Sequence, residues 1–79
     1  MLTCLVFSGV AWVVIEDEWS PRHNIIRADR ISIVEPTTYK NAKTVVGISR
    51  DDLTGGALAT AEEPLEFIEF VSGCIESAK

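Results

Sequence analysis

The opening of the chain limits most strongly what it can fold into, because residues 2–15 are almost entirely apolar. This stretch is too short to cross a bilayer as a helix, which takes about 20 residues. No Lys or Arg precedes it, so it lacks the charged start of a signal peptide. Ser8 and Gly9 divide it into two runs rich in β-branched and aromatic residues, 2–7 and 10–15. This pattern predicts two buried strands joined as a tight hairpin.

Short β-prone segments separated by turn formers follow the hairpin. Pro36 is expected to end one of them, because proline donates no hydrogen bond to a sheet and restricts the backbone of the residue before it. Gly55 and Gly56 favour a turn later in the chain. The expected strands cover residues 25–26, 31–34, 44–48 and 57–60, and the expected loops and turns cover 16–24, 28–29, 37–41 and 51–56.

The last part of the chain predicts one amphipathic helix. Thr60, followed by Glu62 and Glu63, fits a capping box with Thr60 as the cap. Pro64 falls within the first turn, where its missing N–H costs little. At about 100° per residue the apolar side chains share one arc, which we expect to lie on the sheet. That arc holds Phe67, Ile68, Phe70, Val71, Cys74, Ile75 and Ala78, while Leu65 falls outside it.

Together these elements predict an α+β fold: a small antiparallel β-sheet of four to five strands, N-terminal hairpin first, covered by one C-terminal amphipathic helix. With 79 residues the chain forms a single domain over 1–79. Its hydrophobic content of 47% is ordinary for a folded domain and too high for a disordered one.

The charge balance bears on possible partners. The net charge is −5, and the seven Lys and Arg are scattered without a cluster. Nucleic acids and anionic lipids are both recognised by basic patches, so we expect neither a nucleic acid nor a membrane as partner.

Cys4 and Cys74 lie near opposite ends of the sequence. The favoured interpretation is two buried thiols in a reducing cytoplasm, since free Cys is among the most buried residue types. The alternative is a disulfide that ties the first strand to the last helix. His23 is the only histidine and CxxC spacing is absent, so no metal site is expected.

Groups suited to catalysis are few. His23 lies in a polar loop with no evident nucleophile or orienting acid, which is typical of a solvated histidine. The carboxylates look solvated rather than tuned by an apolar pocket, as general acid–base catalysis requires. We therefore expect neither an enzyme nor a cofactor. The expected acidic surface comprises Glu16, Asp17, Glu18, Asp51 and Asp52.

Trp19 directly follows three acidic residues. An exposed Trp beside acids can anchor a basic partner. The alternative, which we favour, is a charged loop whose Trp folds back onto the domain.

A series of residues between 25 and 75 resembles the FlbD family of small bacterial proteins. The similar positions are Ile26, Asp29, Ile31, Val34 and Glu35, then Thr44, Val46 and Ile48, and finally Gly56, Thr60, Glu62, Glu63, Leu65 and Ile68. The longer apolar hairpin and the insertion over 16–24 depart from the family pattern. The resemblance implies a β-rich, non-enzymatic accessory protein that works through protein contacts, in that family linked to motility.

Two functional hypotheses follow. The first is a small interaction or accessory domain that binds a protein partner and forms a homodimer through the hairpin, because one helix covers only one face of the sheet. The expected interface residues are Leu5, Phe7, Trp12, Val14 and Trp19. The second is an acidic inhibitor, encoded by a phage or mobile element, that occupies the nucleic-acid-binding site of a host enzyme.

Overall fold

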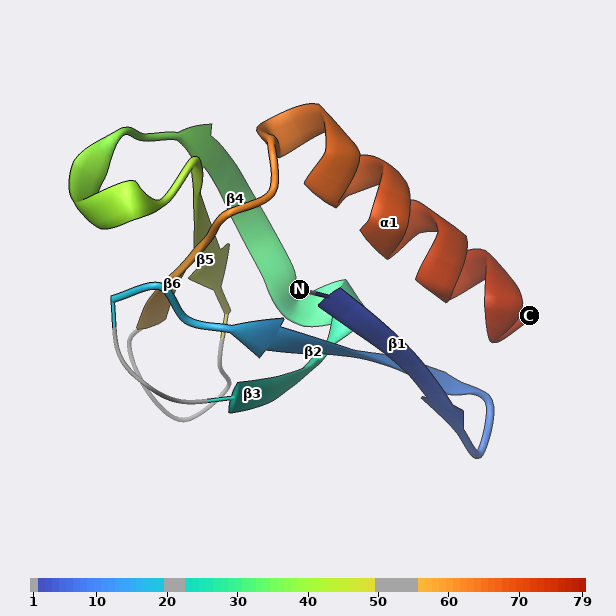
Figure 1. Cartoon of the computed structure of the whole chain (residues 1–79). Helices are drawn as coiled ribbons and strands as arrows, with labels where there is room; N and C mark the ends of the chain where they lie inside the picture. Colours follow the sequence, from blue (N-terminus) through green and yellow to red (C-terminus); the bar gives the residue numbers. More distant parts are fainter. Residues whose placement is uncertain (1, 20–22, 50–55) are drawn as a thin grey trace.

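The computed structural model describes residues 2–19, 23–49 and 56–79. Within them the chain forms six strands and one α-helix, together with 3-10 turns at Ala28–Arg30 and Tyr39–Asn41 (Figure 1). The elements are β1 (Leu2–Phe7), β2 (Val10–Glu16), β3 (His23–Arg27), β4 (Ile31–Pro36), β5 (Thr44–Ile48), β6 (Gly56–Thr60) and α1 (Pro64–Ser77).

The strands form two antiparallel sheets of three strands each, ordered β1-β2-β3 and β4-β5-β6. The α+β class is confirmed, and the expectation of one sheet with four to five strands was wrong. The chain leaves the first sheet at the 3-10 turn Ala28–Arg30, so the consecutive strands β3 and β4 do not pair. Ala28 is 3% exposed, which anchors this turn in the core.

The N-terminal hairpin has the predicted strands and turn. Ser8 and Gly9 have φ values of 52° and 75°. Positive φ at both turn residues matches the right-handed twist of the flanking strands, which explains why a two-residue loop suffices. The polar loop expected over 16–24 is shorter than predicted, because β2 continues through Glu16 and β3 begins at His23.

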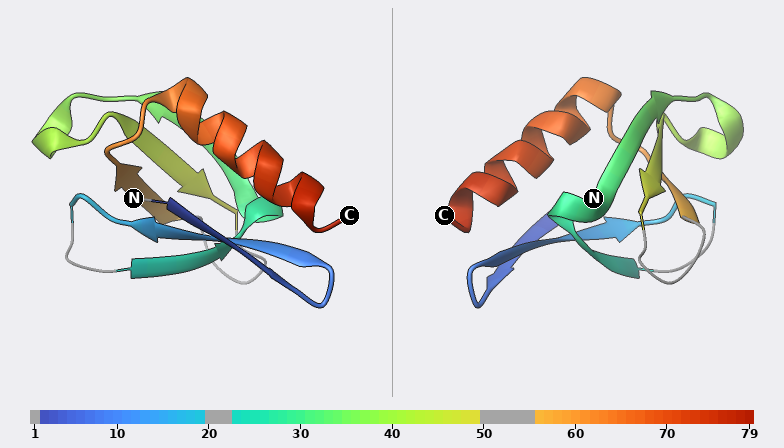
Figure 2. Two further views of the ribbon diagram at one scale, coloured as in Figure 1. Left: turned by 45° about the vertical axis from the view of Figure 1, so that its right-hand side comes forward. Right: turned by 180° about the vertical axis from the view of Figure 1, so that it is seen from behind.

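One core is shared by the two sheets and the helix, whose arrangement is visible from two sides in Figure 2. On β2 the buried residues alternate with half-buried ones, as a strand with one face in the core requires. Phe67 of α1 is fully buried against this face. The core cluster comprises Ala11, Val13, Ile15, Ile26, Ala28, Val46, Ile48, Leu58, Phe67, Val71 and Cys74.

The helix begins later than its capping pattern predicted. Its N-cap is Glu63, which makes no side-chain capping bond, and Pro64 is the first helical residue. Thr60 instead ends β6, and its hydroxyl donates to the Glu62 carboxylate at 2.5 Å. The predicted cap was wrong because a proline disfavours the helical conformation of the residue before it, and Glu63, which precedes Pro64, is extended at φ −64° and ψ 149°.

The apolar arc of the helix is only partly covered. Phe67, Val71 and Cys74 are buried, and Phe70, Ile75 and Ala78 are packed against the core at partial burial. Ile68 was expected in the buried arc, yet it remains 45% exposed. It lines an open pocket between α1 and β4, so the packing of the helix on the second sheet leaves a gap beside it.

The two cysteines form a disulfide that joins β1 to α1, with Cα atoms 5.6 Å apart. The favoured interpretation of two buried thiols was wrong, and the alternative is the observed state. The Sγ of Cys74 lies 3.4 Å from the carbonyl oxygen of Trp12. This is a packing contact, because a disulfide sulfur carries no hydrogen to donate.

Candidate interaction surface

The first sheet has a second face, opposite the core, that no described element covers. Ala11, Val13 and Ile15 of β2 point into the core, so Val10, Trp12 and Val14 point the other way. Residues paired directly across strands lie on the same face of a sheet. The register therefore adds Phe7, Leu5 and Thr3 from β1 and Ile25 and Arg27 from β3.

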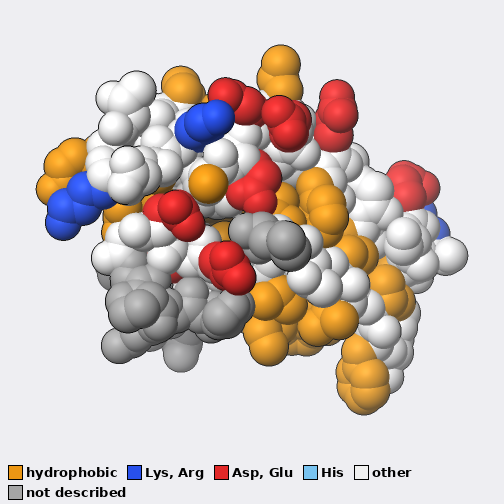
Figure 3. Space-filling view, in the orientation of Figure 1, with side chains coloured by type: hydrophobic (Ala, Val, Ile, Leu, Met, Phe, Trp, Pro, Cys, Tyr) orange, Lys and Arg blue, Asp and Glu red, His pale blue; other side chains and the backbone are white. Residues whose placement is uncertain are grey.

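The resulting surface is mostly apolar. We define the outer face as Leu5, Phe7, Val10, Trp12, Val14 and Ile25. Phe7 is 74% exposed, Ile25 62% and Leu5 45%, whereas the three β2 residues are half-buried between their neighbours. Hydrophobic side chains gather over β1 and the hairpin end in the space-filling view (Figure 3). Four of the expected interface residues, Leu5, Phe7, Trp12 and Val14, thus lie together on one face.

Ile25 was not among the residues singled out in the sequence. Its apolar character predicted a strand, but only the pairing of Ile25 with Val14 places it on the outer face. That pairing joins strands separated by residues 17–22, and no local pattern in the sequence specifies it. The outer face therefore extends over all three strands of its sheet instead of the hairpin alone.

Trp19 lies elsewhere. Its indole N–H donates to the carbonyl oxygen of Tyr39 at 3.0 Å. The two rings meet edge to face with centroids 5.7 Å apart. The interpretation in which Trp19 folds back onto the domain is confirmed, and the structure does not bring this residue to the outer face.

The acidic loop is partly engaged inside the domain. The Asp17 carboxylate accepts from the backbone N–H of Trp19 at 3.0 Å and of Ala59 at 3.4 Å. The N–H of Glu18 donates to the carbonyl of Ala59 at 3.0 Å, which joins the end of β2 to β6. Glu16 and Glu18 are exposed. Asp51 and Asp52, also expected on an acidic surface, lie outside the described residues.

Asp17 is thus engaged inside the domain, and the inhibitor hypothesis stays a prediction. Across the described ranges, no group of three or more His, Cys, Asp or Glu side chains is arranged to hold a metal ion. In the same ranges, no helix has both the length and the apolar character needed to span a membrane.

No family model, curated protein or solved structure matches the chain. The resemblance to the FlbD family therefore stays a prediction.

Proposed function

We propose that this protein is a small non-enzymatic interaction domain that self-associates through the outer face of its first sheet. The observation that carries the proposal is the outer face itself, an apolar surface continuous over three strands and centred on Trp12. Apolar area removed from water stabilises an interface by roughly 25 cal/mol per Å². Three large aliphatic or aromatic side chains on this face, Leu5, Phe7 and Ile25, are at least 45% exposed.

A second copy is the partner that the geometry favours. A two-fold dimer brings the same surface of both copies together, so a single apolar face is sufficient on each. Packing two such faces covers Phe7 and Ile25, which nothing in the described chain covers.

Sedimentation equilibrium over a micromolar concentration range tests the proposal. We expect the wild type to shift from the monomer mass of 8.7 kDa toward twice that value. Phe7→Ser should abolish the shift, because it places a hydroxyl at the most exposed apolar position of the outer face. A monomer mass at every concentration of the wild type would refute self-association.

Leu65→Ser is a matched control for that experiment. Leu65 is 75% exposed on α1, against 74% for Phe7, and it lies far from the outer face in sequence and on a different element. The control variant should associate like the wild type. Equal dissociation by both substitutions would mean that association depends on general surface hydrophobicity and not on the outer face.

The cellular location expected from the sequence, the cytoplasm, stays a prediction. The Cys4–Cys74 disulfide is an observation against it, because disulfides persist in oxidising compartments and are rare in reducing ones. The accessory role implied by the FlbD resemblance agrees with an interaction domain, and the link to motility has no support in the geometry.

A further inference from the structure

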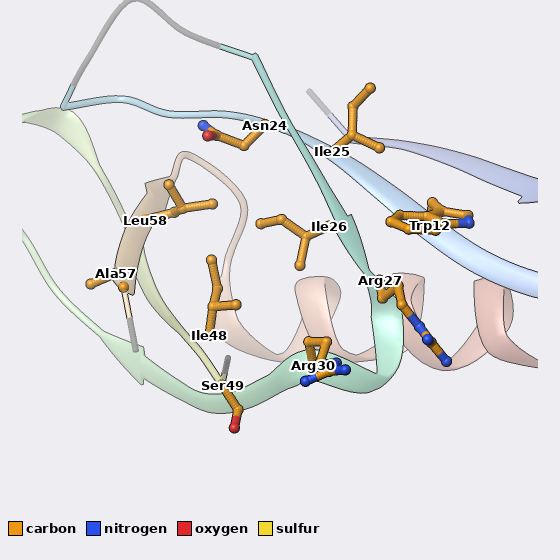
Figure 4. Close-up of a pocket in the computed structure, with 11 residues that line it drawn as sticks. Trp12, Asn24, Ile25, Ile26, Arg27, Arg30, Ile48, Ser49, Ala57 and Leu58 are labelled. Carbon is orange, nitrogen blue, oxygen red and sulfur yellow. The ribbon is translucent and has the colours of Figure 1, made fainter. Parts of the chain in front are cut away.

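A pocket of about 510 Å³ opens where β3 of the first sheet faces β5 and β6 of the second (Figure 4). Its size falls within the range of about 300–1,000 Å³ that small-molecule sites occupy. Ile26, Ile48 and Leu58 lie between its two ends and give it an apolar centre. The chain leaves the first sheet after β3, so this pocket is lined by residues of both sheets.

The polar side chains of the pocket favour an anion. Arg27, Arg30 and Ser49 line one end, and the backbone N–H of Ser49 donates to the Arg30 carbonyl at 2.8 Å. Asn24 lies at the other end. None of the described lining residues is Asp or Glu, although the chain has 12 acidic and seven basic residues. Two of the seven basic residues thus lie at this pocket, and one of them, Arg27, is paired with Asp29.

Two hydrogen-bond donors of the pocket are buried without a partner: Nδ2 of Asn24 and Nε of Arg27. Most buried polar atoms in native structures are paired, and leaving one unpaired is destabilising. The Nη2 of Arg27 already donates to Asp29 at 3.0 Å. The Nε–H of the same guanidinium has no acceptor. The Arg27 side chain is 40% exposed, which leaves it room to turn toward a bound group.

From this combination we propose that the pocket binds a small carboxylate with an apolar body. The carboxylate lies at the Arg27 end and accepts from Nε, and the body extends over Ile26, Ile48 and Leu58. Charge-assisted hydrogen bonds of this kind are the stronger ones, and an apolar centre removes the body from water. The pocket borders the outer face, since Trp12 and Ile25 line both and Arg27 pairs with Trp12 across the strands.

Titration with decanoate, followed by calorimetry and by amide NMR shifts of the oxidised protein, tests the site. We expect saturable binding below the micelle concentration, with shifts concentrated at residues 24–30 and 48–49. Decyltrimethylammonium has the same chain length and the opposite charge, and it should not bind there. Absence of saturable decanoate binding, or equal binding of both amphiphiles, would overturn the proposal.

Two variants locate the binding. Arg27→Gln should lower the affinity for decanoate at least about tenfold, because it removes the charged donor. Ala57→Phe fills the pocket from β6, where Ala57 lines it, and should weaken binding as strongly without touching a charge. Wild-type affinity in either variant would place the ligand elsewhere and refute the pocket. Neither variant changes Trp12 or Ile25, which the pocket shares with the outer face.

Lys43→Gln is the matched charge control. It also removes one positive charge, but Lys43 pairs with Glu63 at 3.3 Å, outside the pocket. We expect its decanoate affinity to stay within about twofold of the wild type, because exposed charges act weakly at a distance in salt. A loss equal to that of Arg27→Gln would show a general charge effect and contradict a specific site.

Discussion

Phe67 and Phe70 lie on the same helix and differ in how far the core covers them. Phe67 is fully buried, whereas Phe70 is only partly buried. Truncating a buried Phe to Ala typically costs about 3–5 kcal/mol, a large part of the ~5–15 kcal/mol that stabilises a domain. We therefore expect Phe67→Ala to unfold the protein or nearly so. Phe70→Ala should lower the free energy of unfolding by clearly less. Urea denaturation measures both, and equal losses would contradict the burial of α1 described above.

Thr60 tests where the helix begins. Its hydroxyl bonds to Glu62 at the end of β6 and does not cap α1. Thr60→Ala should therefore lower the free energy of unfolding by about 1 kcal/mol, the usual net value of one hydrogen bond, while the helical circular dichroism stays unchanged. A loss of helical signal in the folded variant would restore Thr60 as the cap.

The disulfide acts on two elements, since it joins β1 to α1 across 70 residues of sequence. Closing a loop of this length restricts the unfolded chain, and the chain-entropy estimate is about 4 kcal/mol. Reduction should lower the free energy of unfolding by about that amount. Denaturation with and without a phosphine reductant measures it. The double variant Cys4→Ala with Cys74→Ala should be as stable as the reduced protein, and the reductant should not change its stability. If the reductant still destabilises this variant, its effect does not come from the disulfide.

Individual elements could be predicted where the signal is local. The β-branched runs and the Ser8-Gly9 turn predicted the hairpin, and helical periodicity of the apolar residues predicted α1. The start of α1 was misplaced because the capping pattern at Thr60 was given more weight than Pro64, which keeps Glu63 extended and so makes it the N-cap. The disulfide has no local signal, since Cys4 and Cys74 are brought together only by the packing of the helix on β1.

At the scale of the whole molecule, net charge opposes self-association. Each copy carries −5, so two copies repel one another, while the outer face that we propose joins them is mostly apolar. Salt screens such repulsion and strengthens apolar contact little at moderate concentration. We expect the dimer to tighten when sodium chloride is raised from low to physiological concentration, as sedimentation at both would show. A dimer that weakens with salt would mean that ion pairs hold it.

The division into two sheets could not be predicted, because strand pairing is set by contacts far apart in sequence. The pattern of β3, the turn at Ala28–Arg30 and β4 is equally compatible with one continuous sheet. The apolar outer face was predicted in part, since the excess of apolar residues in the hairpin is visible in the sequence. The pocket was missed, since Asn24, Arg27 and Leu58 line one space only after the two sheets have packed.

The link between Cys4 and Cys74 also makes most of the backbone a covalent ring. A protease that cuts once anywhere inside this ring produces two pieces that remain bonded to each other. A nicked molecule would keep its mass on a denaturing gel until a reductant is added. It could also keep its fold, because the β1–α1 junction holds the separated segments at a high effective concentration.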